Sequence, residues 1–396
     1  FQNPAARRSA CYFAHVTKQK MSCKPGNKIK LYAFIIGINL LLLELLSFFA
    51  VKYFEDKGGI LDAHPILHHT WKPYIRFHDQ NRSEPYYLVT NGNRWVEEYD
   101  IPTQKEARTF RIFFVGDSNV QGVVAPENKM VEVVEKKLNQ SVAPDVKIEV
   151  INTGTSSYSP ALYYLLVKNE LIKYSPDLIV ICVDMTDVAY DYNYLNSHAI
   201  FQNEDLISID GIKEKKNPRT YLYPEGFCRL SNYGSLYNFL AEHTSTFRLI
   251  NTALLKTKVK KCAEFDKSAN WLSLEWDKKV DSCVNNSLGF LSKTVRFLKD
   301  KNIKVMLTGV PHYPQYAGEW SNKPHTVLEE FAAKEHIPFL NSYERLKPII
   351  ENTKVEKYYW NTDPTHFNKA GNEIWAASQV EFLTNPSNGL IPFSFK

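Results

Sequence analysis

Four short polar segments of this sequence contain the residue types that nucleophilic catalysis requires. They are Gly116-Asp117-Ser118-Asn119, Asn152-Thr153-Gly154, Asp184-Met185-Thr186-Asp187 and Asp363-Pro364-Thr365-His366. A serine hydroxyl is a weak nucleophile until a base removes its proton, and histidine has the pKa that suits this task at neutral pH. Ser118, with His366 as its base and Asp363 to orient the imidazole ring, therefore predicts attack on an acyl carbon.

Each segment also has an ordinary structural explanation when it is considered alone. Gly-Asp-Ser is common in turns, and a single loop histidine is more often a surface residue than a catalyst. The pair Asp363 and His366 has the types of a metal site, but no second His/Asp cluster at ligand spacing accompanies it. We therefore expect no metal and no organic cofactor. The prediction of catalysis depends on the four segments occurring together.

The elements that precede these segments predict where they lie. Apolar runs indicate buried parallel strands at 111–115, 146–151, 178–183 and 303–308, with a shorter strand at 337–340. In open α/β sheets, ligands bind beyond the carboxyl ends of the strands. The first three polar segments directly follow three of these strands, so we expect them at one edge of the sheet.

Helical patterns separate the strands. Met130, Val134 and Leu138 recur at i, i+4 and i+8, and Ser159-Pro160 is a typical helix opening. Further helices are expected around 288–298 and from about Asn368. Strands that alternate with helices predict an α/β fold, here a three-layer α/β/α arrangement with a mostly parallel sheet.

The chain from about 110 to 384 resembles the SGNH (GDSL-type) hydrolase superfamily. The resemblance is carried by FFVGDSNVQG, VINTGTSSYSP, PDLIVICVDMTDVAYD and DPTHFNKAGNEIWA. It implies a three-layer fold and the hydrolysis or transfer of an acyl group, with Ser118, Asp363 and His366 as the catalytic triad. It also implies an oxyanion hole formed by the backbone N–H groups of Ser118 and Gly154 and by a side chain of the third segment.

The third segment departs from the family pattern. Asp187 stands where the resemblance implies an asparagine, and Asn119 stands where an apolar residue usually follows the nucleophile. An ionised carboxylate repels an oxyanion and has no proton to donate. Asp187 would serve as a donor only when protonated, with Asp184 nearby to raise its pKa. Thr186 and Asn193 are the alternative donors.

A long apolar segment near the N-terminus predicts a membrane anchor. Residues 31–51 carry a single charge, Glu44, and a helix of this length crosses a hydrocarbon core of about 30 Å. A buried core helix and a cleaved signal peptide are the alternatives. Glu44 is expected to be protonated or to mark a helix–helix contact. Basic residues are more frequent before the segment than after it, which predicts a single-pass protein with a cytoplasmic N-terminus and an extracytoplasmic catalytic domain.

Composition divides the rest of the chain. The expected parts are a basic N-terminal segment at 1–30, a connecting segment at 52–105, the α/β/α domain at 106–384 with an insertion at about 190–282, and a tail at 385–396. Met21 opens a basic leader, so residues 1–20 are expected to be an upstream extension. The net charge of +5 is mild, and nucleic-acid binding is not expected. The lysines at 256, 258, 260 and 261 suit a solvated face, or else contact with an anionic polymer or lipid headgroups.

These observations predict a membrane-anchored serine esterase. Its expected substrate is an acylated carbohydrate or similar ester outside the cytoplasm, from which it removes acyl groups, acetyl foremost. One alternative is an O-acyltransferase that uses the same triad to acylate a sugar hydroxyl. The other is a catalytically weak binding protein of SGNH fold, which the replacement at Asp187 favours.

Overall fold

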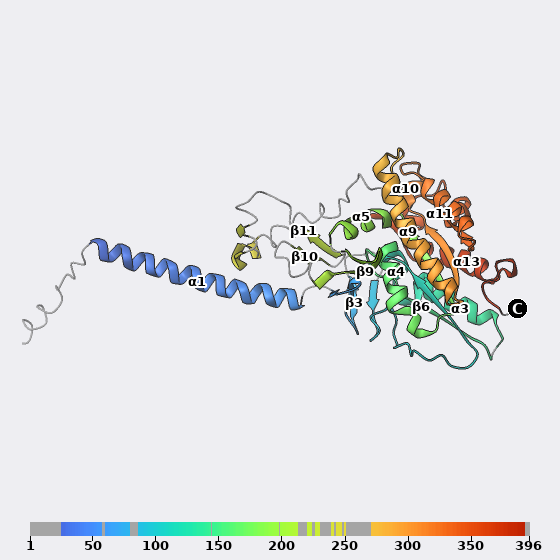
Figure 1. Cartoon of the computed structure of the whole chain (residues 1–396), viewed down its shortest axis with the longest axis horizontal. Coiled ribbons are helices and arrows are strands. Elements are labelled where there is room, and N and C mark those ends of the chain that lie inside the picture. Colours follow the sequence, from blue (N-terminus) through green and yellow to red (C-terminus); the bar gives the residue numbers. More distant parts are fainter. Residues whose placement is uncertain are drawn as a thin grey trace, which may run out of the picture.

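A long N-terminal helix, α1 (Pro25–Lys57), projects from an α/β body (Figure 1). The computed structural model describes residues 25–392 apart from 58–59, 80–85, 144, 198, 213–219, 224–225, 230–238, 241–242, 248 and 251–270. Residues 1–24, which include most of the expected basic segment, and the lysines at 256, 258, 260 and 261 lie outside the described residues.

The body is built on a five-stranded sheet in which every neighbouring pair is parallel. The strand order is β13 (Phe339–Leu340), β12 (Lys304–Val310), β7 (Leu178–Asp184), β5 (Thr109–Val115) and β6 (Lys147–Asn152). These strands coincide within a few residues with the five apolar runs. The α/β prediction is therefore confirmed.

Side chains that alternate along each strand fill two separate cores. Phe113 and Val115 point to one core, while Ile112 and Phe114 point to the other, as a pleated strand requires. The first core is covered by α4 (Pro160–Asn169), α5 (Asp187–Ser197), α9 (Lys278–Asp300) and α11 (Lys323–Lys334). The second is covered by α3 (Met130–Ser141), α12 (Ser342–Ile350) and α13 (Lys369–Thr384). The sheet is thus the middle of three layers.

Local sequence signals explain where these helices begin. Met130, Val134 and Leu138 are fully buried on one face of α3, as their spacing predicts. Pro160 is the first residue of α4, where its missing N–H costs nothing. Asn368 caps α13 by accepting a hydrogen bond from the Gly371 N–H.

Two hairpins before the sheet belong to the body. They are β1 (Leu61–His64) with β2 (His68–Trp71), and β3 (Arg76–Asp79) with β4 (Tyr86–Val89). Trp71 is buried, and its Nε1–H donates to the Gly154 carbonyl at 2.9 Å. The segment that was expected to connect the anchor to the domain therefore supports the loop after β6.

Smaller elements complete the described chain. The region of the expected insertion holds two antiparallel hairpins, β8 (Ala199–Gln202) with β9 (Asp205–Ile209) and β10 (Thr220–Tyr223) with β11 (Gly226–Arg229). The remaining short elements are α2 (Ser118–Gln121), α10 (Tyr313–Tyr316), β14 (Tyr359–Trp360), β15 (Asp363–Phe367) and single 3-10 turns at Pro126–Asn128, Leu171–Tyr174, Val355–Lys357 and Pro386–Asn388.

Helix α1 contains a stretch, Lys28–Ala50, that is long and apolar enough to cross a membrane, and little of it is buried. A signal sequence also has these properties. The carboxylate of Glu44 accepts hydrogen bonds from the backbone N–H groups of Ser245 and Thr246, and the Thr246 hydroxyl lies 3.1 Å from that of Ser47. Ser245 and Thr246, far along the chain, thus bind Glu44, the one charged residue of 31–51.

Candidate active site

The nucleophile candidate Ser118 is the first residue of the short helix α2, directly after β5. Asp117 caps this helix: its Oδ1 accepts the Asn119 N–H at 2.8 Å. At the other end of α2, the buried Lys129 donates from Nζ to the carbonyls of Gln121 and Gly122. Contacts at both ends fix the position of Ser118 at the carboxyl edge of the sheet.

The structure brings Ser118, His366 and Asp363 into one hydrogen-bonded chain. Ser118 Oγ lies 2.8 Å from His366 Nε2, and His366 Nδ1 lies 3.0 and 2.9 Å from the two carboxylate oxygens of Asp363. His366 and Asp363 are three residues apart on β15, whose pairing with β14 fixes the loop before α13. Their side chains are 20% and 26% exposed, so both reach solvent.

The charge of this site favours a protonated imidazole at rest. Burial opposes protonation of His366, but the carboxylates of Asp363, Asp117 and Asp184 outweigh it and raise the pKa of His366 to about 9. A general base must be neutral to accept the serine proton. The reactivity of Ser118 is therefore expected to increase as pH rises toward that pKa.

The two backbone donors expected for an oxyanion differ in their surroundings. As the first residue of α2, Ser118 has an N–H group that the helix itself does not use. The Gly154 N–H instead donates to Asn152 Oδ1 at 3.0 Å. A Cβ atom at Gly154 would lie 2.1 Å from the Gln121 backbone N, so glycine is needed for close packing of this loop against α2.

Two of the three side chains proposed for the third oxyanion donor, those of Asp187 and Thr186, are engaged in hydrogen bonds. Asp187 is fully buried, and its Oδ2 accepts from the Tyr163 hydroxyl and from the Asp184 N–H, both at 2.9 Å. Thr186 is half-buried and donates from N and Oγ1 to Asp184 Oδ1. Asn193 is exposed on α5. Asp187 therefore lies beneath the site, and Thr186 is the third-segment side chain nearest to solvent.

Asp184 is the centre of a buried polar network behind Ser118. Its Oδ2 accepts from Asn119 Nδ2 and from His312 Nε2, each at 2.8 Å, and its Oδ1 accepts twice from Thr186. Burial alone would raise the pKa of Asp184, but His312 and these hydrogen bonds lower it to about 2. Asp184 is therefore ionised at neutral pH.

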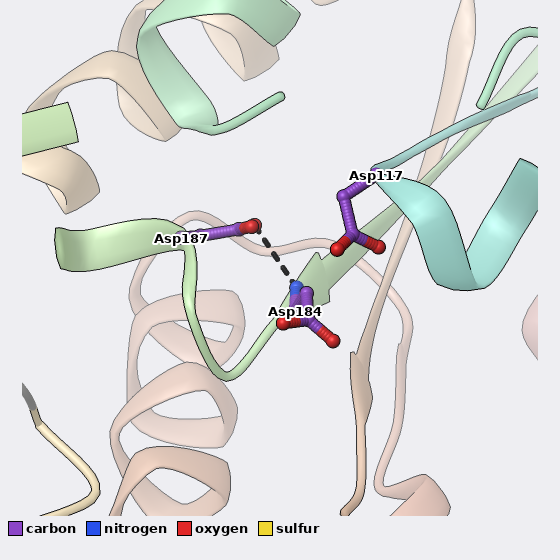
Figure 2. Close-up of side chains that lie close together, drawn as sticks. All are labelled: Asp117, Asp184 and Asp187. Carbon is purple, nitrogen blue, oxygen red and sulfur yellow. Dashed lines mark hydrogen bonds between the residues drawn. The ribbon is translucent and has the colours of Figure 1, made fainter. Parts of the chain in front are cut away.

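Three buried carboxyl groups meet in this network, those of Asp117, Asp184 and Asp187 (Figure 2). One oxygen of each lies within 4.8 Å of the others, as for ligands of one cation. However, both oxygens of Asp184 already accept two hydrogen bonds each. Burial and the charge of Asp184 raise the pKa of Asp117 to about 8, and burial, Asp117 and Asp184 hold the pKa of Asp187 well above its ordinary range. The arrangement fits carboxyl groups that retain protons.

Sequence reasoning missed His312 and the purpose of Asn119. His312 follows β12, so the rule that polar residues gather at the carboxyl ends of parallel strands would have found it. Asn119 looked like a departure from the family pattern, and the structure gives it a partner in Asp184. A further residue without a sequence signal is the buried Ser157, whose φ of 64° lies in the left-handed region.

No family model and no curated protein matches the chain. Among solved structures, a catalytic mutant of the acetylxylan esterase Axe2 from Geobacillus stearothermophilus is similar at 14% identity and a TM-score of 0.40, over 71% of this chain and 96% of that chain. A two-domain esterase active on acetylated mannans is similar at 13% identity and a TM-score of 0.39, over 72% of this chain and 52% of its own. Likeness at this level carries no argument about activity.

Proposed function

We propose that this chain is a serine ester hydrolase that removes acyl groups, acetyl foremost, from an acylated carbohydrate or similar ester. The observation that supports the proposal is the continuous contact from Ser118 Oγ through the His366 imidazole to the Asp363 carboxylate. Each distance is short enough for proton transfer or orientation. The resemblance of the sequence to SGNH hydrolases supports the same reaction.

The reaction follows from these positions. Ser118 Oγ passes its proton to His366 Nε2 and forms a bond to the ester carbonyl carbon, while Asp363 stabilises the imidazolium. The Ser118 N–H, which α2 itself does not use, is the donor that we assign to the oxyanion that forms. His366 then protonates the leaving alcohol, and an acyl group remains on Ser118. Water attacks this acyl-enzyme with His366 as base, and the carboxylic acid and the free serine are regenerated.

Acyl transfer differs from hydrolysis only in the final acceptor. A sugar hydroxyl in place of water would leave the roles of Ser118, His366 and Asp363 unchanged. Product analysis separates the two reactions, because transfer yields an acylated sugar and hydrolysis yields the free acid. A binding protein of this fold would yield neither product.

The proposal is tested by the hydrolysis of p-nitrophenyl acetate and of acetylated oligosaccharides by the full chain in detergent. Ser118→Ala and His366→Ala are each expected to lower kcat/KM by at least ~10³-fold, since triad residues act as a unit. Ser282→Ala is the matched control, because Ser282 is exposed on α9. A folded parent that is no faster than both triad variants would show that the chain is not a hydrolase of these esters.

We also propose that α1 anchors the protein in a membrane as a single span. The apolar stretch Lys28–Ala50 supports this assignment. The basic residues that precede it support a cytoplasmic N-terminus with the α/β body on the opposite side.

A further inference from the structure

The carboxyl groups of Asp117, Asp184 and Asp187 differ in how readily they ionise. Like charges this close, and buried, cannot all ionise at neutral pH. Among the described residues, the one imidazole that bonds to any of the three is His312, on Asp184. Asp184 also accepts from the Asn119 amide and twice from Thr186. These partners stabilise the negative charge of Asp184. Asp117 and Asp187 are therefore left to carry protons.

The two oxygens of Asp117 lie in different surroundings. Oδ1 accepts the Asn119 N–H at 2.8 Å and so acts as the carbonyl-like oxygen. Oδ2 accepts from the Ser118 hydroxyl at 3.2 Å in the structure. The serine hydroxyl has a single proton, and in the reactive arrangement that proton points to His366 Nε2 at 2.8 Å. The contact between Asp117 and Ser118 is then favourable only when the donor is Asp117.

We propose that Asp117 is a further catalytic residue: as a neutral carboxylic acid it donates a hydrogen bond from Oδ2 to Ser118 Oγ. This inference rests on the proposed ester hydrolysis. In acylation, the proton of Ser118 goes to His366 while Asp117 keeps its own. In deacylation, the bond between the acyl carbon and Oγ breaks, and Oγ takes its proton back from His366. The Asp117 hydroxyl stabilises the charge that develops on Oγ in both steps.

The charged and titratable groups that face Asp117 all bear on this assignment. They are the carboxyls of Asp184 and Asp187, the imidazole of His366, the hydroxyl of Tyr163 and the thiol of Cys182. Two of them are carboxyl groups that oppose a charge on Asp117. Among these groups His366 favours that charge, in its protonated, unreactive form, and the hydrogen bonds from the Asn119 N–H and the Ser118 hydroxyl favour it as well. The reaction requires neutral Asp117 beside neutral His366, a form whose population is greatest between their pKa values of about 8 and about 9.

The test compares Asp117→Asn and Asp117→Leu in the full chain. Asparagine cannot ionise, but its amide N–H takes over the donation, so kcat/KM at neutral pH should stay within about threefold of the parent. Leucine has no donor and should lower kcat/KM by about 10²-fold. The activity of the parent should rise as His366 loses its proton and should fall again as Asp117 ionises, with a maximum between their pKa values of about 8 and about 9, whereas the activity of Asp117→Asn should keep rising toward pH 9. Equal loss in both variants, when circular dichroism shows both folded, would overturn the inference.

Infrared difference spectroscopy gives a result that does not depend on activity. A protonated carboxyl has a C=O stretching band that a carboxylate lacks, and the difference between parent and Asp117→Asn should contain this band at neutral pH. Absence of the band would refute the neutral state of Asp117 whatever the reaction is. If the band is present but the parent has no esterase activity, the neutral state of Asp117 stands. The proposed function is then rejected, and with it the catalytic role of Asp117.

Discussion

The buried pair of Asp184 and His312 supports the candidate active site around Ser118. Both side chains are 1% exposed, so solvent and salt screen their contact of 2.8 Å very little. A buried carboxylate is tolerated only when it is paired and fully hydrogen-bonded. Here the pair holds Asn119, the residue after the nucleophile, through the Asp184 carboxylate. Loss of either partner would therefore lower the stability of the body and also displace Ser118.

Replacement of His312 by leucine should strongly destabilise the protein. It leaves the buried Asp184 charge without its partner, and we expect the free energy of unfolding to fall by about 3–5 kcal/mol. Urea unfolding measures this change, and Gln140→Leu, at an exposed position on α3, should stay within about 0.5 kcal/mol of the parent. A loss no larger than that of the control would mean that the pair does not stabilise the fold.

The same pair predicts how stability depends on pH. The folded-state pKa of Asp184 is about 2, below its ordinary value of 3.8. Its contribution is therefore fully present above pH 4 and is lost as pH falls toward 2. The stability of the parent should decline over this window more steeply than that of His312→Leu. Parallel acid curves for the two proteins would contradict the assignment.

At the scale of elements, the site depends on close contact between the loop after β6 and the helix α2. The Asn152 side chain links them, because Nδ2 donates to the Val120 carbonyl and Oδ1 accepts from Gly154 N–H. Trp71 supports the same loop from the β1–β2 hairpin. The loop thus sets the position of α2, and α2 sets that of Ser118.

Gly154→Ala should damage both stability and activity. The added Cβ would lie 2.1 Å from the Gln121 N, so α2 must move. We expect a loss of about 1–3 kcal/mol in unfolding free energy and a fall in kcat of about 10²-fold from misplacement of Ser118. The matched control is Gly289→Ala on the exposed face of α9, where nothing lies within 4 Å of the added carbon. It should stabilise the protein by about 0.5–1 kcal/mol. Similar behaviour of the two variants would exclude the close contact.

Local patterns in the sequence predicted those elements that local forces determine. The strand at Leu178–Asp184 and the helix that starts at Pro160 followed from an apolar run and a proline at the first turn. Ser118 and His366 were predicted as a pair because each lies in a polar segment of the right types. No local sequence pattern could have predicted the contact of Asp184 with His312, which lies 128 positions away. The hairpins at 61–89 were missed because short strands, packed mostly on the body, lack sustained periodicity.

The described part of the molecule is an α/β body beside one long apolar helix. We expect the body to lie outside the cytoplasm, because the basic residues precede α1. Protease added to intact cells should then digest the α/β body, detected by an antibody to the C-terminus. A cytoplasmic marker protein should survive in the same sample, and permeabilised cells should lose both. Full protection of the body in intact cells would reverse the proposed orientation.

The link between α1 and the body limits where this protein can work. The apolar stretch ends at Ala50, α1 ends at Lys57 and β1 begins at Leu61, so about 10 Å of helix and at most about 14 Å of further chain separate the proposed span from the body. If α1 spans a bilayer as proposed, a body tethered this closely searches a thin layer at the membrane surface rather than the bulk solution. Esters held in that layer meet Ser118 at an effective concentration in the millimolar range, so even a weakly bound substrate would be processed. Release of the body from its tether should therefore impair turnover of surface-bound esters far more than turnover of soluble ones.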